Sequence, residues 1–156
     1  MTLSLAELGT AVATAKPFFD YLSQNAKTKL VRMLSTSLGA LAKKLGTQRF
    51  MVFHQPQINQ LAVNFPQADL LLGKPLPAAA ALSFYQQLPQ GSDFVPARQL
   101  TWLIDSQTRL QEYAALANAL NQPLQIAFEI DIGLARGGFA TPEALGSALN
   151  WLRSTP

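Results

Sequence analysis

Residues Leu124 to Phe139 read LQIAFEIDIGLARGGF, the stretch of the chain that most clearly indicates its fold. Apolar side chains occupy every second position at the start of this stretch. Successive side chains of a strand point to opposite faces, so a two-residue period predicts a strand. Its buried row would be Leu124, Ile126, Phe128 and Ile130.

Glycines and one arginine follow this predicted strand. Gly133, Gly137 and Gly138 give the backbone the freedom to turn tightly, and Arg136 carries a permanent cation with five hydrogen-bond donors. The residues Thr-Pro-Glu at positions 141–143 then predict a helix, with the threonine as its cap and the proline at its first position.

Two interpretations of Arg136 remain open. Ligands of α/β proteins usually bind at the carboxyl ends of the strands, which favours a binding role for this side chain. An ion pair on the surface with Glu129 or Asp131 is about equally compatible with the spacing.

Composition limits the classes of protein that the chain can represent. Its 156 residues are enough for one domain with a core, and the absence of cysteine excludes disulfides and thiolate metal sites. Charged residues make up 13% of the chain, against roughly 25% in a typical soluble domain, while apolar residues make up 49%. We therefore expect that much of the surface is buried against something, or that the chain is part of a larger unit.

Charge and hydropathy disfavour two kinds of partner. The net charge is only +3 and Lys43-Lys44 is the only adjacent basic pair, so we expect no nucleic-acid binding. No apolar stretch reaches the roughly 20 residues that span a bilayer, so we expect no membrane insertion. The opening LSLAELGTAVATA lacks a basic start and contains Glu7, which is untypical of a signal peptide, so we expect a cytoplasmic protein.

The first part of the chain, residues 1–46, is predicted to be a helical lead-in with one candidate strand. Pro17 to Ala26 has apolar residues at helical spacing, and Leu30 to Leu34 could form a short strand. Ser35 to Leu45 is predicted to be a helix that ends before Gly46. Residues 47–156 are then the main domain.

Strands and helices alternate through the main domain. Besides the strand beginning at Leu124, the predicted strands are Arg49 to His54, which has the pattern of a buried strand, Ala68 to Leu72 and Leu100 to Asp105. The predicted helices are Gln55 to Phe65, Ala78 to Leu88, Gln107 to Leu120 and Pro142 to Arg153. This alternation predicts an α/β fold of parallel strands joined by right-handed helical crossovers.

Polar residues follow the carboxyl ends of successive strands. His54, Lys74, Asp105 and Arg136 all occupy such positions, and a parallel sheet would bring them to one rim. Each also has a structural interpretation: His54 as a hydrogen-bonded rim residue, Lys74 as a solvated loop cation, and Asp105 as the cap of the next helix, which cap preferences favour.

The pieces RFMVFHQP, ADLLLGKPLP, LTWLIDS and EIDIGLARGGF, in this order and spacing, resemble the amino-terminal barrel domain of pyridoxal-phosphate enzymes of the alanine racemase fold. The nearest branch is that of D-threonine aldolase-like and amino-acid deaminase-like proteins. The resemblance covers roughly Gly46 to Pro156 and implies a partial (β/α)8 barrel of four to five units. It also implies pyridoxal 5'-phosphate as the cofactor.

The resemblance assigns roles to rim residues. Arg136 would approach the phenolic oxygen of the cofactor and the lysine that forms the Schiff base. His54, Asp105 and Asp131 would lie around the cofactor, with Lys74 near them. No metal ligands are implied for this part of the family fold.

The position of the Schiff-base lysine is open. Lys16, which precedes Pro17, fits one alignment, and Lys29 is a weaker choice. A second alignment puts Leu30 to Leu38 on the first strand, where Thr36 then replaces the lysine.

The resemblance implies a pyridoxal-phosphate-dependent lyase, deaminase or aldolase-type domain that acts on D- or β-hydroxy amino acids. Since a complete barrel needs about 250 residues, the chain is expected to be an incomplete fragment. One alternative is a non-catalytic half-barrel that only self-associates, and another is an amino-acid racemase. In each case we expect a homo-oligomer, because a half-barrel exposes strand edges and apolar faces.

Overall fold

The structure is a computed structural model, and it describes residue 44 and residues 46–155. The elements of this part, in chain order, are β1 (Arg49–Val52), α3 (Gln55–Asn64), β2 (Asp69–Leu72), α4 (Ala78–Gln87), α5 (Pro96–Gln99), β3 (Leu100–Ile104), α6 (Gln107–Leu120), β4 (Gln125–Phe128) and α7 (Pro142–Ser154). Lys16, Lys29 and the candidate strand at Leu30 to Leu34 lie outside the described residues.

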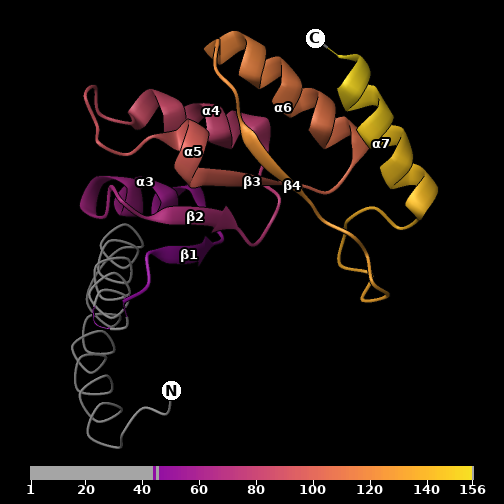
Figure 1. Cartoon of the computed structure of the whole chain (residues 1–156), viewed down its shortest axis with the longest axis horizontal. Coiled ribbons are helices and arrows are strands. Elements are labelled where there is room, and N and C mark those ends of the chain that lie inside the picture. The colour runs from indigo at the N-terminus through magenta and orange to yellow at the C-terminus, as the bar shows by residue number, and fades with distance from the viewer. Residues whose placement is uncertain (1–43, 45, 156) are drawn as a thin grey trace, which may run out of the picture.

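The four strands form one parallel sheet in the order β1-β2-β3-β4 (Figure 1). One row across the sheet runs through Met51, Leu71, Thr101 and Gln125, which are partners in the register. The predicted α/β fold with parallel strands is confirmed, and the sheet with its alternating helices is consistent with a partial β/α barrel. Several strands are shorter than predicted. Val52 ends β1, for example, since His54 already caps α3.

One face of the sheet carries the core of the described part. Helices α3, α4 and α6 lie beside one another over this face (Figure 1). Trp102 lies at the centre of the core and its ring contacts Phe84 edge-on, with the ring centroids 6.1 Å apart. The indole nitrogen of Trp102 donates a hydrogen bond of 3.2 Å to the Tyr85 hydroxyl, so its polar atom is satisfied inside the core. The strands contribute Val52, Leu70, Leu72, Leu100, Trp102 and Ile104 to this core.

The opposite face of the sheet, here called the open face, has no covering layer among the described residues. Met51, Phe53 and Leu71 lie on it with 59%, 43% and 37% of their surfaces exposed. Arg49 to His54 was predicted to be a buried strand. This prediction is wrong for the side chains on the open face, which are exposed, and Val52 is the only residue of this segment that is buried. Parallel sheets are normally covered on both faces, so these side chains mark a surface that lacks its usual cover among residues 46–155.

Side-chain caps fix where the later helices begin. Ser106 caps α6, since its hydroxyl oxygen accepts a hydrogen bond of 3.2 Å from the backbone nitrogen of Arg109. The prediction that Asp105 caps this helix is therefore wrong. Thr141 caps α7 in the same way through Ala144, as predicted. The single turn of α5 was not predicted, because four residues are too few to show helical periodicity.

No helix within residues 46–155 combines the length and the apolar character that a membrane crossing requires.

Candidate functional site at the carboxyl ends of the strands

Because all four strands are parallel, their carboxyl ends meet at one end of the sheet, here called the carboxyl rim. Asp105 and Glu129 directly follow β3 and β4, and His54 and Lys74 lie two residues beyond β1 and β2. Arg136 lies in the loop that joins β4 to α7. The sheet therefore brings the polar residues of separate sequence segments to the same rim.

The loop between β4 and α7 returns to the strand from which it starts. The backbone nitrogen of Phe139 donates to the oxygen of Glu129 at 2.8 Å, and the nitrogen of Asp131 donates to the oxygen of Phe139 at 3.1 Å. Ile130 and Phe139 thus form a short parallel bridge. The predicted buried row is only half-buried: Leu124, Ile126 and Phe128 are partly exposed and pack against the core, and Ile130 is 55% exposed. Phe139 instead enters the core, where its ring contacts that of Phe128.

The carboxylate of Asp131 binds the backbone of its own loop. Its Oδ1 atom accepts hydrogen bonds from the nitrogens of Gly133 and Ala135, at 2.9 and 3.1 Å. Ala135 has a φ of 50°, which is uncommon for a residue with a side chain and is stabilised here by its hydrogen bond to the carboxylate. This loop therefore has a defined shape although most of it is exposed.

Arg136 is exposed in the same loop. Among the described residues, no salt bridge joins it to Glu129 or Asp131, so the surface ion pair considered from the sequence is not formed. A guanidinium is always charged and cannot accept hydrogen bonds, so its five donors remain directed at solvent or an anionic ligand. Arg136 therefore has the chemistry and the location of an anion-binding residue at the carboxyl rim.

Asp105 is already engaged by its own helix. Its Oδ1 atom accepts a hydrogen bond of 3.2 Å from the Ser106 hydroxyl and lies 3.7 Å from Nε of Arg109. Arg109 also donates to Glu112, with Nη1 2.7 Å from the carboxylate oxygen. The carboxylate of Asp105 is thus part of a small polar network at the start of α6, in which Arg109 is shared between Asp105 and Glu112.

His54 and Lys74 are both exposed at the carboxyl rim. The backbone oxygen of His54 accepts the first hydrogen bonds of α3, whereas its imidazole does not cap the helix. Lys74 lies in the turn between β2 and α4. Neither side chain has a salt bridge in the part of the chain that the structure describes, and neither lines the groove described next.

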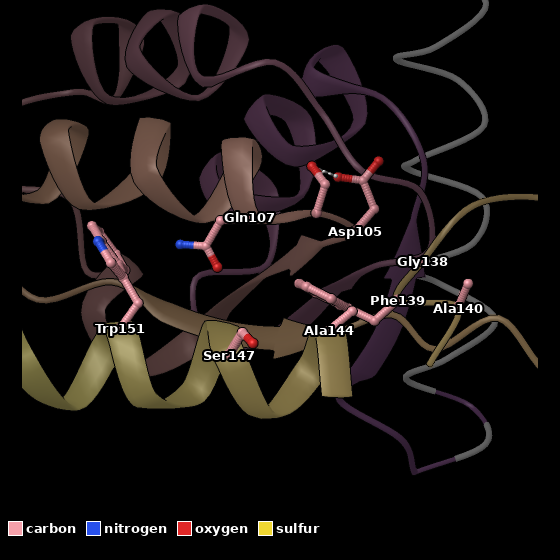
Figure 2. A pocket seen from close by; sticks show the side chains of 9 residues that line it. Asp105, Gln107, Gly138, Phe139, Ala140, Ala144, Ser147 and Trp151 are labelled. Atoms are coloured by element: carbon pink, nitrogen blue, oxygen red, sulfur yellow. Dashed lines mark hydrogen bonds between the residues drawn. The ribbon is translucent and has the colours of Figure 1, made fainter. Parts of the chain in front are cut away.

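A groove adjoins the rim between the start of α6 and the exposed turns of α7 (Figure 2). Its volume is about 550 Å³ and it is open to solvent. Its wall includes Asp105 and Gln107 on one side and Ser147 and Trp151 on the other. The complete lining is Asp105, Ser106, Gln107, Gly138, Phe139, Ala140, Ala144, Ser147 and Trp151.

The groove residues of α7 were not predicted from the sequence. Ala144, Ser147 and Trp151 are spaced by three and four residues, which places them on one face of a helix. That spacing was the available signal, although it is equally typical of a core-facing stripe.

The donor set at the rim fits an anionic cofactor in part. Arg136, Lys74 and His54 supply cationic or hydrogen-bonding groups that are not engaged in salt bridges within residues 46–155. Asp105 and Asp131 fit such a cofactor less well, because they are anionic and one oxygen of each carboxylate already has a partner. Within the described residues no group of three or more His, Asp or Glu side chains could hold a metal ion.

A parallel β/α sheet with a polar carboxyl rim defines a barrel-type domain whose ligand would bind at that rim. The family model described as "Alanine racemase, N-terminal domain" matches residues 22–156. The chain therefore belongs to this family. Its members depend on pyridoxal phosphate, act on amino acids and are generally dimeric. Comparison with curated proteins gives no match.

Proposed function

We propose that the chain forms part of a cytoplasmic pyridoxal-phosphate-dependent lyase, deaminase or aldolase that acts on D- or β-hydroxy amino acids. The observation that carries this proposal is Arg136, a guanidinium without a salt bridge in the described part, at the carboxyl rim of a chain from this family. Its loop is shaped by internal hydrogen bonds, so the cation is presented from a defined backbone.

In this proposal Arg136 donates hydrogen bonds to an anionic oxygen of the cofactor ring. A fixed positive charge at this point favours the deprotonated oxygen, and it lowers the pKa of a lysine placed beside it. His54 and Lys74 contribute an imidazole and an ammonium from neighbouring strands of the same rim. The bound cofactor would supply the electron sink that labilises the bonds at the α-carbon of the amino acid.

Lys16 is the proposed attachment point of the cofactor, with Lys29 as the second candidate. Both lie outside the described residues, and the proposal for them rests on the family resemblance of the sequence. A lysine in this role must be uncharged to react, which a neighbouring guanidinium favours.

Cofactor binding can be tested by titrating the full chain with pyridoxal phosphate and following the absorbance. Arg136→Ala is expected to weaken binding by at least about tenfold, because a charge-assisted hydrogen bond is lost. Arg98→Ala is a matched control, since Arg98 is also exposed but lies in α5, just before β3 and thus at the opposite end of the sheet. Equal affinities for the two variants would contradict the proposed role of Arg136.

The attachment point requires a second experiment. Borohydride reduction followed by peptide mapping is expected to give a labelled Lys16, and no label in Lys16→Ala. A label spread over exposed lysines such as Lys44 and Lys74 would indicate non-specific reaction and contradict an organised site.

The reaction class can be separated by product analysis with a β-hydroxy amino acid such as D-threonine. An aldolase reaction breaks the bond between the α- and β-carbons and gives glycine and an aldehyde. A deaminase reaction gives a 2-oxo acid and ammonia, whereas a racemase inverts only the α-carbon and gives L-allo-threonine from D-threonine. Inversion alone would favour the racemase alternative.

The open face supports the second candidate function, self-association without catalysis. Met51, Phe53 and Leu71 form an exposed apolar surface on a sheet type that is usually covered. Sedimentation velocity of the full chain should then show oligomers, and Phe53→Lys should shift the distribution toward monomer. A monomeric wild type that does not bind pyridoxal phosphate would contradict both candidates.

A further inference from the structure

We infer that Asp131 is a positioning residue, which sets the location of Arg136 at the carboxyl rim and does not itself contact the cofactor. This inference rests on the proposed function, because it assigns the means by which Arg136 is presented. It also revises the role suggested for Asp131 by the family resemblance, which placed this carboxylate around the cofactor.

Hydrogen bonds hold the backbone on the amino-terminal side of Arg136. Oδ1 of Asp131 accepts from the backbone nitrogens of Gly133 and Ala135, and Ala135 directly precedes Arg136. Ala135 adopts a left-handed backbone, with φ at 50°. This conformation is sterically unfavourable for an alanine, so the hydrogen bond to the Asp131 carboxylate is the interaction that stabilises it.

Close backbone packing holds the chain on the carboxyl-terminal side of Arg136. Gly138 has a φ of +99°, and a Cβ atom there would lie 2.8 Å from the backbone oxygen of Glu129 and 2.9 Å from the nitrogen of Asp131. The backbone at Gly138 is therefore in close contact with the end of β4. Phe139 continues this contact, since its nitrogen donates to the Glu129 oxygen at 2.8 Å.

Arg136 is thus placed between two anchored points that are three residues apart, Ala135 and Gly138. The amino-terminal anchor depends on one side-chain oxygen, while the other depends on the backbone. No salt bridge joins Asp131 to Arg136 in the described part of the chain, so the effect of Asp131 passes through the loop backbone. Because Oδ1 of Asp131 already accepts hydrogen bonds from Gly133 and Ala135, this atom has less capacity to accept a hydrogen bond from a ligand.

This mechanism predicts a particular order of variants. Asp131→Asn keeps an acceptor oxygen at the same distance from the backbone, so it should preserve the loop. Asp131→Ala removes the acceptor and should release Gly133 and Ala135. Asp93→Ala is the control, because Asp93 is an exposed acid in the loop between α4 and α5.

Amide hydrogen exchange of the full chain, measured without cofactor, tests the loop directly. Asp131→Ala is expected to accelerate exchange at Gly133 and Ala135 by about tenfold or more, since a hydrogen bond to a charged acceptor is lost. Asp131→Asn should remain much closer to the wild type, and Asp93→Ala should not change these two amides. Unchanged exchange in Asp131→Ala would overturn the inference.

A double-mutant cycle on pyridoxal-phosphate affinity tests the link to Arg136. Asp131→Ala should weaken binding in the same direction as Arg136→Ala, and Asp131→Asn should restore most of it. The double variant Asp131→Ala/Arg136→Ala should bind no more weakly than Arg136→Ala, because a displaced and an absent arginine are equivalent. An additive loss would mean that Asp131 acts on the cofactor by itself and would overturn the positioning role.

The outcomes separate this inference from the proposed function. If Arg136→Ala weakens binding and Asp131→Ala does not, the positioning role fails and the proposed function stands. If Arg136→Ala leaves the affinity unchanged, the proposed function fails, and the positioning role fails with it whatever the exchange rates are.

Discussion

Gly138 offers the most quantitative test of the loop structure at the carboxyl rim. In Gly138→Ala the new Cβ would lie 2.8 Å from the Glu129 oxygen and 2.9 Å from the Asp131 nitrogen, which are backbone atoms that cannot rotate away. Gly133→Ala is a matched control, because Gly133 has nearly the same φ, +97° against +99°, and no atom within 4 Å of the added Cβ. The difference between the two variants therefore isolates the close backbone contact.

The expected magnitudes follow from these contacts. A left-handed alanine costs about 1 kcal/mol at either position. At Gly138 the clash also disturbs the bonds from Phe139 to Glu129 and from Asp131 to Phe139, each contributing about 1 kcal/mol. We expect a loss of about 1 kcal/mol of unfolding free energy for Gly133→Ala and about 3 kcal/mol for Gly138→Ala.

Urea unfolding followed by tryptophan fluorescence measures both losses. The free energy of unfolding should depend on urea concentration with the same slope in both variants as in the wild type, so that differences in midpoint report differences in stability. If Gly138→Ala and Gly133→Ala lose the same free energy, the loop does not pack against the end of β4 as described.

Two further predictions concern the core and a helix cap. Ser106→Ala should lower the free energy of unfolding by about 1 kcal/mol, because α6 loses the hydrogen bond from the Arg109 nitrogen to its cap. Ser106→Asp should retain most of the wild-type stability. Equal urea midpoints for the wild type and both variants would contradict this. Burial raises the pKa of Tyr113 above its ordinary value of 10.0, so the stability that its neutral form contributes is present below pH 10 and is lost as the pH rises further. Tyr113→Phe should lower the free energy of unfolding by about 1 kcal/mol at neutral pH, because the hydrogen bond to the Leu76 oxygen is lost. In urea unfolding at pH 11 this difference from the wild type should shrink or reverse. A difference that does not depend on pH would refute the proposed link between Tyr113 ionisation and stability.

Much of the fold could be predicted because local patterns and tertiary contacts agree in this chain. Gln107 to Leu120 was predicted with the observed bounds, since its apolar spacing, its preceding Ser106 and its following turn all indicate the same helix. The end of β4 was predicted less well. Ile130 continues the alternation of apolar residues, but the return of Phe139 to the strand takes the buried position that the pattern assigned to Ile130.

The placement of the candidate residues at strand ends was predictable, but their individual partners were not. Strand ends in a parallel sheet identify the carboxyl rim from sequence alone, which is why His54, Lys74, Asp105 and Arg136 share it. The partners of each carboxylate depend on short-range geometry that spacing does not determine. Asp105 therefore turned out to lie beside Arg109, with Ser106 as the cap, and Asp131 to bind its own loop.

The central claim is that pyridoxal phosphate binds at the carboxyl rim, and mapping its effect on backbone amide resonances by NMR tests this most directly. We expect shifts concentrated in residues 129–139 and at His54 and Lys74, with little change at Thr47, Gln67 and Arg98, which precede β1, β2 and β3. Changes confined to the latter residues, or no saturable change at all, would contradict the claim.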